Sequence, residues 1–319
     1  MKILVPLNNR EDVKSFSAAG ANELYLGFYD ERWTEKFGIY TDINRMSGFG
    51  KLANKYSFSE ILSIIQDIRT ENMDAFVTMN ANSYSEESLK WIEEQYFPSL
   101  IEAGVSGVIV STEGIARKAI NAGLQVVAST MMGLYNSDII NYYRSIGIKR
   151  MIVPRDLSLN EIAMIRKNVP DIDLEVFFMR NGCVFSDAFC LGTHRKECGS
   201  TCGSLKSLNK KIISSSSSFR FRHSVELNDL LYHNYFHHDA CGMCALYRME
   251  ELNVTALKIV GRADMPGSVA EDIRLTKENM AILKECNSEE EYLEKMIFPY
   301  NSYKQCKLGL SCYYPEVRF

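Results

Sequence analysis

The chain has 319 residues, of which 46% are hydrophobic and 24% charged, the balance of a globular protein with a sizeable core. Its formal net charge is −4 and its pI is about 5.9, so no overall positive field attracts nucleic acid. No apolar run approaches the ~18 residues of a membrane span. The first residues lack a signal-peptide pattern, so we expect a cytoplasmic protein whose thiols stay reduced.

Short apolar, β-branched runs recur along the chain, with helical stretches between them. Seven of these runs end at Val5, Leu26, Val77, Val110, Val127, Val153 and Phe177, and an eighth covers 256–260. Such runs are typical of parallel strands that are buried on both faces. Eight strands alternating with helices predict an α/β fold, a (βα)8 TIM-like barrel. The alternative is a doubly wound open sheet.

Helix start and stop signals lie between the predicted strands. Ser158 precedes Glu161 by three residues, the spacing of a capping box, and Ser57, Ser85 and Asn136 open other helical stretches. Glycines stand where four helices would end, at Gly20, Gly104, Gly123 and Gly147. These signals strengthen the prediction of helices between consecutive strands.

The regular alternation breaks between the seventh and eighth strands. We expect a (βα)8-type barrel over 1–286, with a cysteine-rich insertion at 180–244, and a C-terminal tail over 287–319. The insertion holds all five histidines of the chain. It is too long for an ordinary strand–helix loop, and loops of this length are usually functional or disordered.

The cysteines form the main chemical signal. All nine lie at or after Cys183, and an odd number argues against a pure disulfide framework. Cys183, Cys190, Cys198 and Cys202 fall within twenty residues. Four thiolates so close together need a compensating cation, and iron–sulfur clusters and zinc are the usual solutions. The wide, unequal spacing favours a cluster, while zinc and ordinary thiols are the alternatives.

Several segments resemble, in order, those of a known family. Residues 18–27 resemble its opening GADAVYLG, 104–111 its AGVDALIVSD, 152–158 its VLPRELS, 174–183 its LEVFVHGALC, and 257–262 its LKIEGR with Val260 in place of glutamate. Because a cysteine set stands between the last two segments, the chain resembles the collagenase-like unassigned peptidases, peptidase family U32.

The resemblance implies a barrel with a [4Fe-4S] cluster bound by Cys183, Cys190, Cys198 and Cys202. It also implies oxygen-independent hydroxylation, because the understood members act on tRNA uridine, ribosomal RNA cytidine or ubiquinone precursors, with prephenate implicated as the hydroxyl source for some. One alternative is a non-catalytic iron–sulfur accessory or electron-relay module in a hetero-oligomer. The other is a collagenase-like peptidase, although the sequence has no Gly-x-Ser-x-Gly or His-Glu-x-x-His motif.

Four later cysteines form a second candidate site: Cys241, Cys244, Cys306 and Cys312. They would hold a second iron–sulfur cluster or zinc, with His233, His237 and His238 as alternate ligands. Ordinary thiols are the other interpretation. Cys286, on the closing helix, is expected to be a core thiol.

Polar residues directly after predicted strands are candidates for the catalytic site. Arg155, Arg262 and Asn80 follow the sixth, eighth and third strands, so a barrel brings them to the C-terminal face where active sites lie. An arginine there would bind a carboxylate of a small anionic substrate. The alternative is an arginine paired structurally with Asp156 or Asp264.

The basic segment 203–223 contains five lysines and arginines and no acidic residue. It would bind RNA or a protein partner, and a solvated loop is the alternative. We therefore expect a small anionic substrate or RNA, and a protein partner or dimer. Lys258, inside the eighth strand, is expected to form a structural ion pair.

Overall fold

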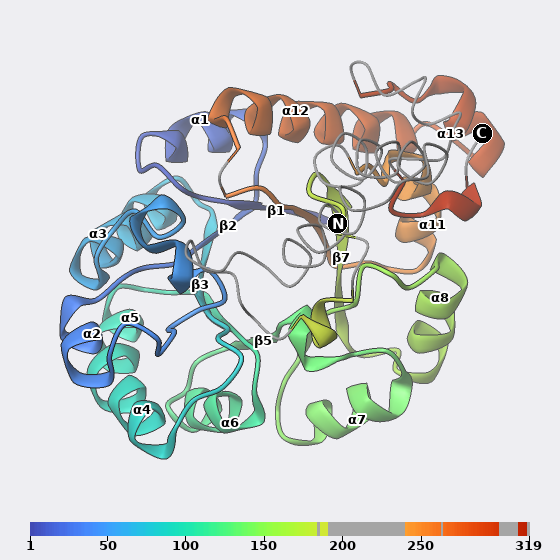
Figure 1. The fold of residues 1–319 in the computed structure, drawn as a ribbon. Helices are drawn as coiled ribbons and strands as arrows, with labels where there is room; N and C mark the ends of the chain where they lie inside the picture. Colours follow the sequence, from blue (N-terminus) through green and yellow to red (C-terminus); the bar gives the residue numbers. More distant parts are fainter. Residues whose placement is uncertain (184–185, 191–239, 263, 300–311, 318–319) are drawn as a thin grey trace, which may run out of the picture.

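The structure, a computed structural model, describes residues 1–183, 186–190, 240–262, 264–299 and 312–317. Within them, eight parallel strands close into a barrel in the order β1 to β8, with β8 paired to β1. The helices form a ring around the strands (Figure 1). The predicted (βα)8 barrel is therefore confirmed, and the open sheet is excluded.

Each strand ends within two residues of its predicted end. The strands are β1 (Lys2–Pro6), β2 (Glu23–Leu26), β3 (Asp74–Met79), β4 (Gly107–Val110), β5 (Val126–Ala128), β6 (Arg150–Ile152), β7 (Asp173–Met179) and β8 (Ala256–Ile259). The agreement follows from burial on both faces, because such strands need an unbroken apolar run.

The helices differ widely in length. They are α1 (Asp12–Ala19), α2 (Glu31–Phe37), α3 (Phe58–Thr70), α4 (Glu86–Trp91), α5 (Phe97–Glu102), α6 (Glu113–Asn121), α7 (Ser137–Ser145), α8 (Leu159–Asn168), α11 (Leu246–Glu251), α12 (Pro266–Leu283) and α13 (Glu289–Lys295). Short helical segments are η1 (Ser47–Leu52), η2 (Ile92–Tyr96), η3 (Thr130–Met132), η4 (Asp187–Phe189), η6 (Met243–Ala245) and η7 (Pro315–Val317). Among the described helices, none has the length and apolarity needed to cross a membrane.

The predicted helix signals are present in the structure. Ser158 caps α8, and Glu161 returns the hydrogen bond to complete the capping box. Ser57, Ser85 and Asn136 cap α3, α4 and α7. The four glycines predicted to end helices all have φ between 80° and 106°, a region that side chains other than glycine rarely adopt.

A buried charge network fills the interior of the barrel near the N-terminal ends of the strands. Arg150 Nη1 donates to Glu23 Oε1 at 2.8 Å, and Arg150 Nε donates to Glu175 Oε2 at 3.0 Å. Lys258 Nζ donates to Glu175 Oε1 at 2.7 Å, which confirms the predicted ion pair. Burial would raise the pKa of Glu175, but Lys258 and Arg150 hold it below its usual value. This end of the barrel is therefore a packed core, and any site must lie at the other end.

The described part of residues 287–319 contacts the barrel. The Tyr292 hydroxyl on α13 donates to Met243 O at 2.9 Å. Near the C-terminus, Tyr313 N–H donates to Cys241 O at 2.9 Å, and the Tyr314 hydroxyl donates to Phe177 O at 2.8 Å. Residues 312–317 thus lie against the C-terminal half of β7, while the boundary at 286 stays a prediction.

Candidate functional site

The chain bends sharply as it leaves β7. Arg180 and Asn181 both have positive φ, +66° and +44°, in the left-handed region that is costly for most side chains. Arg180 N–H donates to Ala240 O at 2.7 Å, and Asn181 O accepts from Arg155 Nη1 at 2.7 Å. These bonds hold the bend that delivers Cys183 to the C-terminal mouth of the barrel.

Asp187 fastens the next part of this loop to the mouth. It lies in η4, between Cys183 and Cys190, and its side chain is 1% exposed. Its carboxylate accepts from Arg45 Nη1 at 2.5 Å and from Arg155 Nε at 2.8 Å. Burial would raise the pKa of Asp187, but the two guanidinium groups lower it to about 2. One ionised carboxylate thus joins the loop to two different parts of the barrel rim.

A second attachment comes from Tyr135, in the loop before α7. Its hydroxyl hydrogen-bonds to Ser186 and donates to Asp156 Oδ2 at 3.0 Å. Within the loop, Cys190 N–H donates to Asp187 O at 3.1 Å. Segment 186–190 is consequently held in place at two points, by the buried carboxylate of Asp187 and by the hydroxyl of Ser186.

Arg155 occupies the predicted place directly after β6. Its guanidinium stacks over the Phe177 ring, 4.0 Å from the centroid, and its carboxylate partner is Asp187. The alternative of a structural ion pair therefore holds for Arg155, but with Asp187 in place of Asp156. Burial would lower the pKa of Arg155, but the charge of Asp187 raises it above its usual value. Asp187 therefore neutralises much of the positive charge of Arg155.

Arg262 lies beyond β8 and differs from Arg155 in its partners. Its Nη2 donates to Thr78 Oγ1 at 2.9 Å and its Nη1 to Asn54 Oδ1 at 3.4 Å. In the part of the chain that the structure describes, no carboxylate pairs with it. The alternative partner Asp264 is wrong, because Asp264 instead pairs with Arg180 at 3.2 Å. Burial lowers the pKa of Arg262, and the charge of Arg45 adds to the effect.

Asn80, the third predicted residue, follows β3 and joins the same rim. Its Oδ1 accepts from Arg45 N–H at 3.3 Å. Arg45 therefore links Asn80 to Asp187, and through Asp187 to Arg155. All three predicted residues lie at the C-terminal ends of strands, while their roles in catalysis stay predictions.

The structure describes only part of each predicted thiol set. Cys198, Cys202, Cys306, the three alternate histidine ligands and the basic segment 203–223 lie outside the described residues. Cys241 forms backbone bridges with Met179 and with Cys312, so Cys241 and Cys312 lie next to each other beside β7. Within the described ranges, no three His, Cys, Asp or Glu side chains gather closely enough to hold a metal ion. Both metal sites remain predictions.

Cys286 follows α12 and is not part of either thiol set. Its Sγ donates to Ile282 O at 3.2 Å, and its side chain packs partly buried against the apolar core. This is the environment expected of a core thiol.

Sequence reasoning missed three residues of this site. Asp187 lies between the candidate ligands Cys183 and Cys190, and this position was the only sequence feature that could have indicated its role. Arg45 lies in the long connection after β2 and gave no signal. Tyr313 lies near the C-terminus, where its ring stacks on Phe177 and its hydroxyl bonds to Arg180 O.

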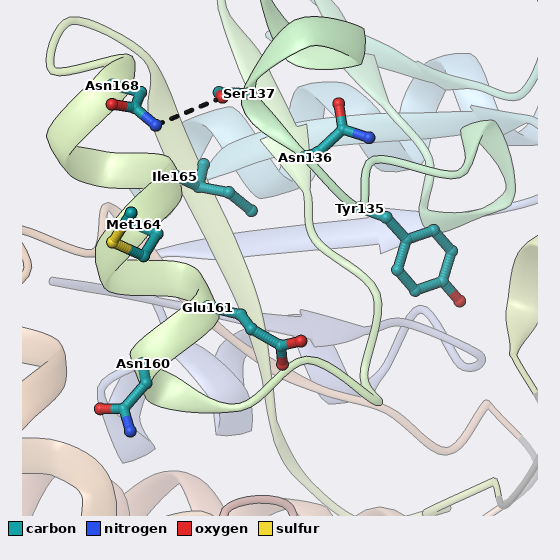
Figure 2. A pocket seen from close by; sticks show the side chains of 8 residues that line it. All are labelled: Tyr135, Asn136, Ser137, Asn160, Glu161, Met164, Ile165 and Asn168. Carbon is teal, nitrogen blue, oxygen red and sulfur yellow. Dashed lines mark hydrogen bonds between the residues drawn. The ribbon is translucent and has the colours of Figure 1, made fainter.

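A separate pocket of about 270 Å³ lies outside the barrel, between the start of α7 and α8 (Figure 2). Its lining includes the amides of Asn136, Asn160 and Asn168. Asn168 Nδ2 donates to Ser137 Oγ at 3.4 Å, and Asn136 Oδ1 caps α7. Capping and local bonds account for the amides of Asn136 and Asn168, and we assign this pocket no ligand.

The family model described as Peptidase family U32 matches residues 8–303, nearly the whole chain. The chain belongs to peptidase family U32. This match confirms the family resemblance that was based on the succession of short motifs along the sequence. Membership agrees with the cysteine-bearing loop at a barrel mouth, which the motifs placed after the seventh strand.

Relatives of this U32-family chain carry different names. The "Uncharacterized protease MJ0090" of Methanocaldococcus jannaschii is 28% identical over 62% of this chain and 46% of its own length. A "tRNA hydroxylation protein P" of Helicobacter pylori is 23% identical over 48% of this chain and 36% of its own length. The chain thus spans less than half the length of these curated relatives.

Among solved structures, the U32 peptidase Mk0906 is similar with a TM-score of 0.51 and 11% sequence identity. The match covers 82% of this chain and 92% of that chain. At this identity the likeness shows the fold alone, and it agrees with the observed barrel.

Proposed function

We propose that this U32-family protein holds a [4Fe-4S] cluster through Cys183, Cys190, Cys198 and Cys202, and that it supports oxygen-independent hydroxylation of RNA or of a small aromatic or quinone-like substrate. The observation that carries the proposal is the anchoring of the loop with Cys183 and Cys190 at the barrel mouth. Active sites of (βα)8 barrels lie at this face. The relative named as a tRNA hydroxylation protein supports RNA as one substrate class.

The described residues suit such a cluster in three ways. Cys183 and Cys190 supply soft thiolate sulfur, the donor that iron–sulfur clusters require. Their loop is fixed by Asp187 rather than free, so the first two ligands would be preorganised. Arg155 also lies near enough to Cys183 for a negative charge on that sulfur to stabilise its guanidinium.

The side chains of the mouth would bind and orient the substrate. A bound cluster would supply redox or Lewis-acid chemistry at the mouth. Arg155 would keep the ligand loop in place, while Asn80 and Arg262 would hold polar groups of the substrate. The ion network of Arg150, Glu175 and Lys258 fills the barrel near the N-terminal ends of the strands, so substrate would enter at the C-terminal ends.

A peptidase is the second candidate, because one relative is named as a protease. Peptidase chemistry through a nucleophile requires a base beside that nucleophile. The described side chains at the mouth are mainly arginines, amides, thiols and hydroxyls, and the carboxylate of Asp187 is already bound by two arginines. The site therefore favours hydroxylation.

The test compares cells with and without the gene, grown without oxygen. Mass spectrometry of tRNA and rRNA nucleosides and of quinone precursors should reveal one hydroxylated product that disappears in the deletion. Wild type should restore it and Cys183→Ser should not, whereas Cys286→Ser, which alters a thiol outside the mouth, should restore it. Unchanged nucleosides and quinones in the deletion would reject hydroxylation.

A further inference from the structure

The three arginines of the mouth are not equivalent. Arg45 and Arg155 share one carboxylate, that of Asp187, at 2.5 and 2.8 Å. Arg262 contacts only neutral partners among the described residues: the Thr78 hydroxyl, the Asn54 amide oxygen and, at 5.4 Å, the Tyr25 ring. Of these three arginines, Arg262 is therefore the one without a carboxylate partner among the described residues.

The surroundings of Arg262 are built to receive its guanidinium. Thr78 and Asn54 are each 2% exposed, and Asn54 is fixed by mutual amide bonds to Asn44. Gly27, at the end of β2, leaves the necessary space, because a Cβ there would lie 2.1 Å from Asn54 Oδ1 and 2.9 Å from Arg262 Nη1. A cation seated in so ordered and dehydrated a cradle is costly without a counter-charge.

We propose that Arg262 is the anion-binding residue of the mouth and that it binds the carboxylate of a small substrate or co-substrate. This inference rests on the proposed function and names the residue and the chemistry of recognition. A guanidinium has five N–H donors, and Thr78 and Asn54 occupy two of them. The remaining donors can form the two parallel bonds that a carboxylate accepts.

A small carboxylate fits this residue better than the phosphates of RNA do. Binding along an RNA backbone depends on several exposed cations at once. At the mouth, however, Asp187 already binds both Arg45 and Arg155, so among these three arginines only the partly buried guanidinium of Arg262 is left without a carboxylate in the described part of the chain. The Tyr25 ring beside it would contact the apolar body of such a ligand.

The test uses the intact protein, purified without oxygen, with benzoate as the probe and neutral benzamide as its isostere. Ligand-observed NMR titration should give benzoate an affinity at least tenfold higher than that of benzamide. Arg262→Gln should weaken benzoate at least tenfold, and Arg262→Lys should retain part of the affinity through its charge. Arg144→Gln, at an exposed arginine paired with Asp171, should change nothing.

A second readout does not depend on binding. Because Arg262 is a desolvated cation that meets no carboxylate among the described residues, Arg262→Gln should leave the melting temperature unchanged or raise it, whereas Arg155→Gln should lower it. Equal affinity for benzoate and benzamide, or benzoate binding that survives Arg262→Gln, would overturn the proposal. So would loss of affinity in this variant for a tRNA transcript but not for benzoate.

Failure of this inference is distinguishable from failure of the proposed function. Iron and sulfide are measured on the same preparations. Cluster-free protein that binds benzoate through Arg262 would reject the cluster and keep the anion site. If protein that contains the cluster does not bind benzoate, the anion site is wrong and the cluster assignment stands.

Discussion

Replacing Asp187 by asparagine removes the charge that joins the ligand loop to the barrel. The carboxylate makes two charge-assisted bonds, to Arg45 and Arg155, and both guanidinium side chains are at most 16% exposed. Bonds of this kind contribute about 1.5–3 kcal/mol each. Breaking a buried pair leaves unpaired charge and costs about 3–5 kcal/mol. We therefore expect Asp187→Asn to weaken the loop attachment by about 3–5 kcal/mol.

The effect should appear in the loop before it appears in the barrel, because the strands do not depend on Asp187. Hydrogen exchange by mass spectrometry should show at least ~100-fold faster exchange over 186–190, which corresponds to about 3 kcal/mol. Anaerobically purified variant should also retain less iron than wild type. The matched control is Asp171→Asn, because the Asp171 side chain is 73% exposed and its pair with Arg144 should be worth at most about 1 kcal/mol. Wild-type exchange and iron content in Asp187→Asn would refute the anchoring role.

Three further changes test other parts of the structure. Glu175→Gln should destabilise the barrel by about 3–5 kcal/mol in urea at pH 7, since it leaves Lys258 without its carboxylate and Arg150 with Glu23 alone. The pKa of Glu175 is lowered in the fold, so its stabilisation is present at neutral pH, and the difference between wild type and variant should shrink only below about pH 4. Arg155→Gln should reduce iron retention while Arg262→Gln should not, and equal retention would contradict their separate roles. If the second thiol set binds metal, a Cys306→Ser, Cys312→Ser double variant should lose metal beyond the first cluster; unchanged content would show ordinary thiols.

The barrel was predictable because its signals are local. Apolar runs, the capping boxes of Ser57 and Ser158, and the four helix-ending glycines each act within a few residues. The pairing of Lys258 was also predictable, because a lysine inside a buried strand requires a buried partner. The family resemblance was recognised in the same way, from short segments that match family motifs in the same order and need no three-dimensional information.

The contacts that define the mouth were not predictable from the sequence, because they join distant segments. Arg45 and Asp187 are 142 positions apart, and Arg262 lies 184 positions from Thr78. Sequence neighbours suggested Asp156 and Asp264 as partners of the two arginines. In the folded barrel, Asp187 of η4 instead pairs with Arg155 after β6, and Asp264 pairs with Arg180. The distinction between a neutralised Arg155 and an uncompensated Arg262 therefore required the structure.

The central claim is that Cys183, Cys190, Cys198 and Cys202 bind an iron–sulfur cluster. The most direct measurement is iron, zinc and acid-labile sulfide per chain in anaerobically purified wild type, Cys183→Ser and the control Cys286→Ser. We predict about four irons and four sulfides in wild type and control, with broad absorbance near ~400 nm, and loss of both in Cys183→Ser. Stoichiometric zinc without sulfide, or equal iron in all three proteins, would contradict the claim.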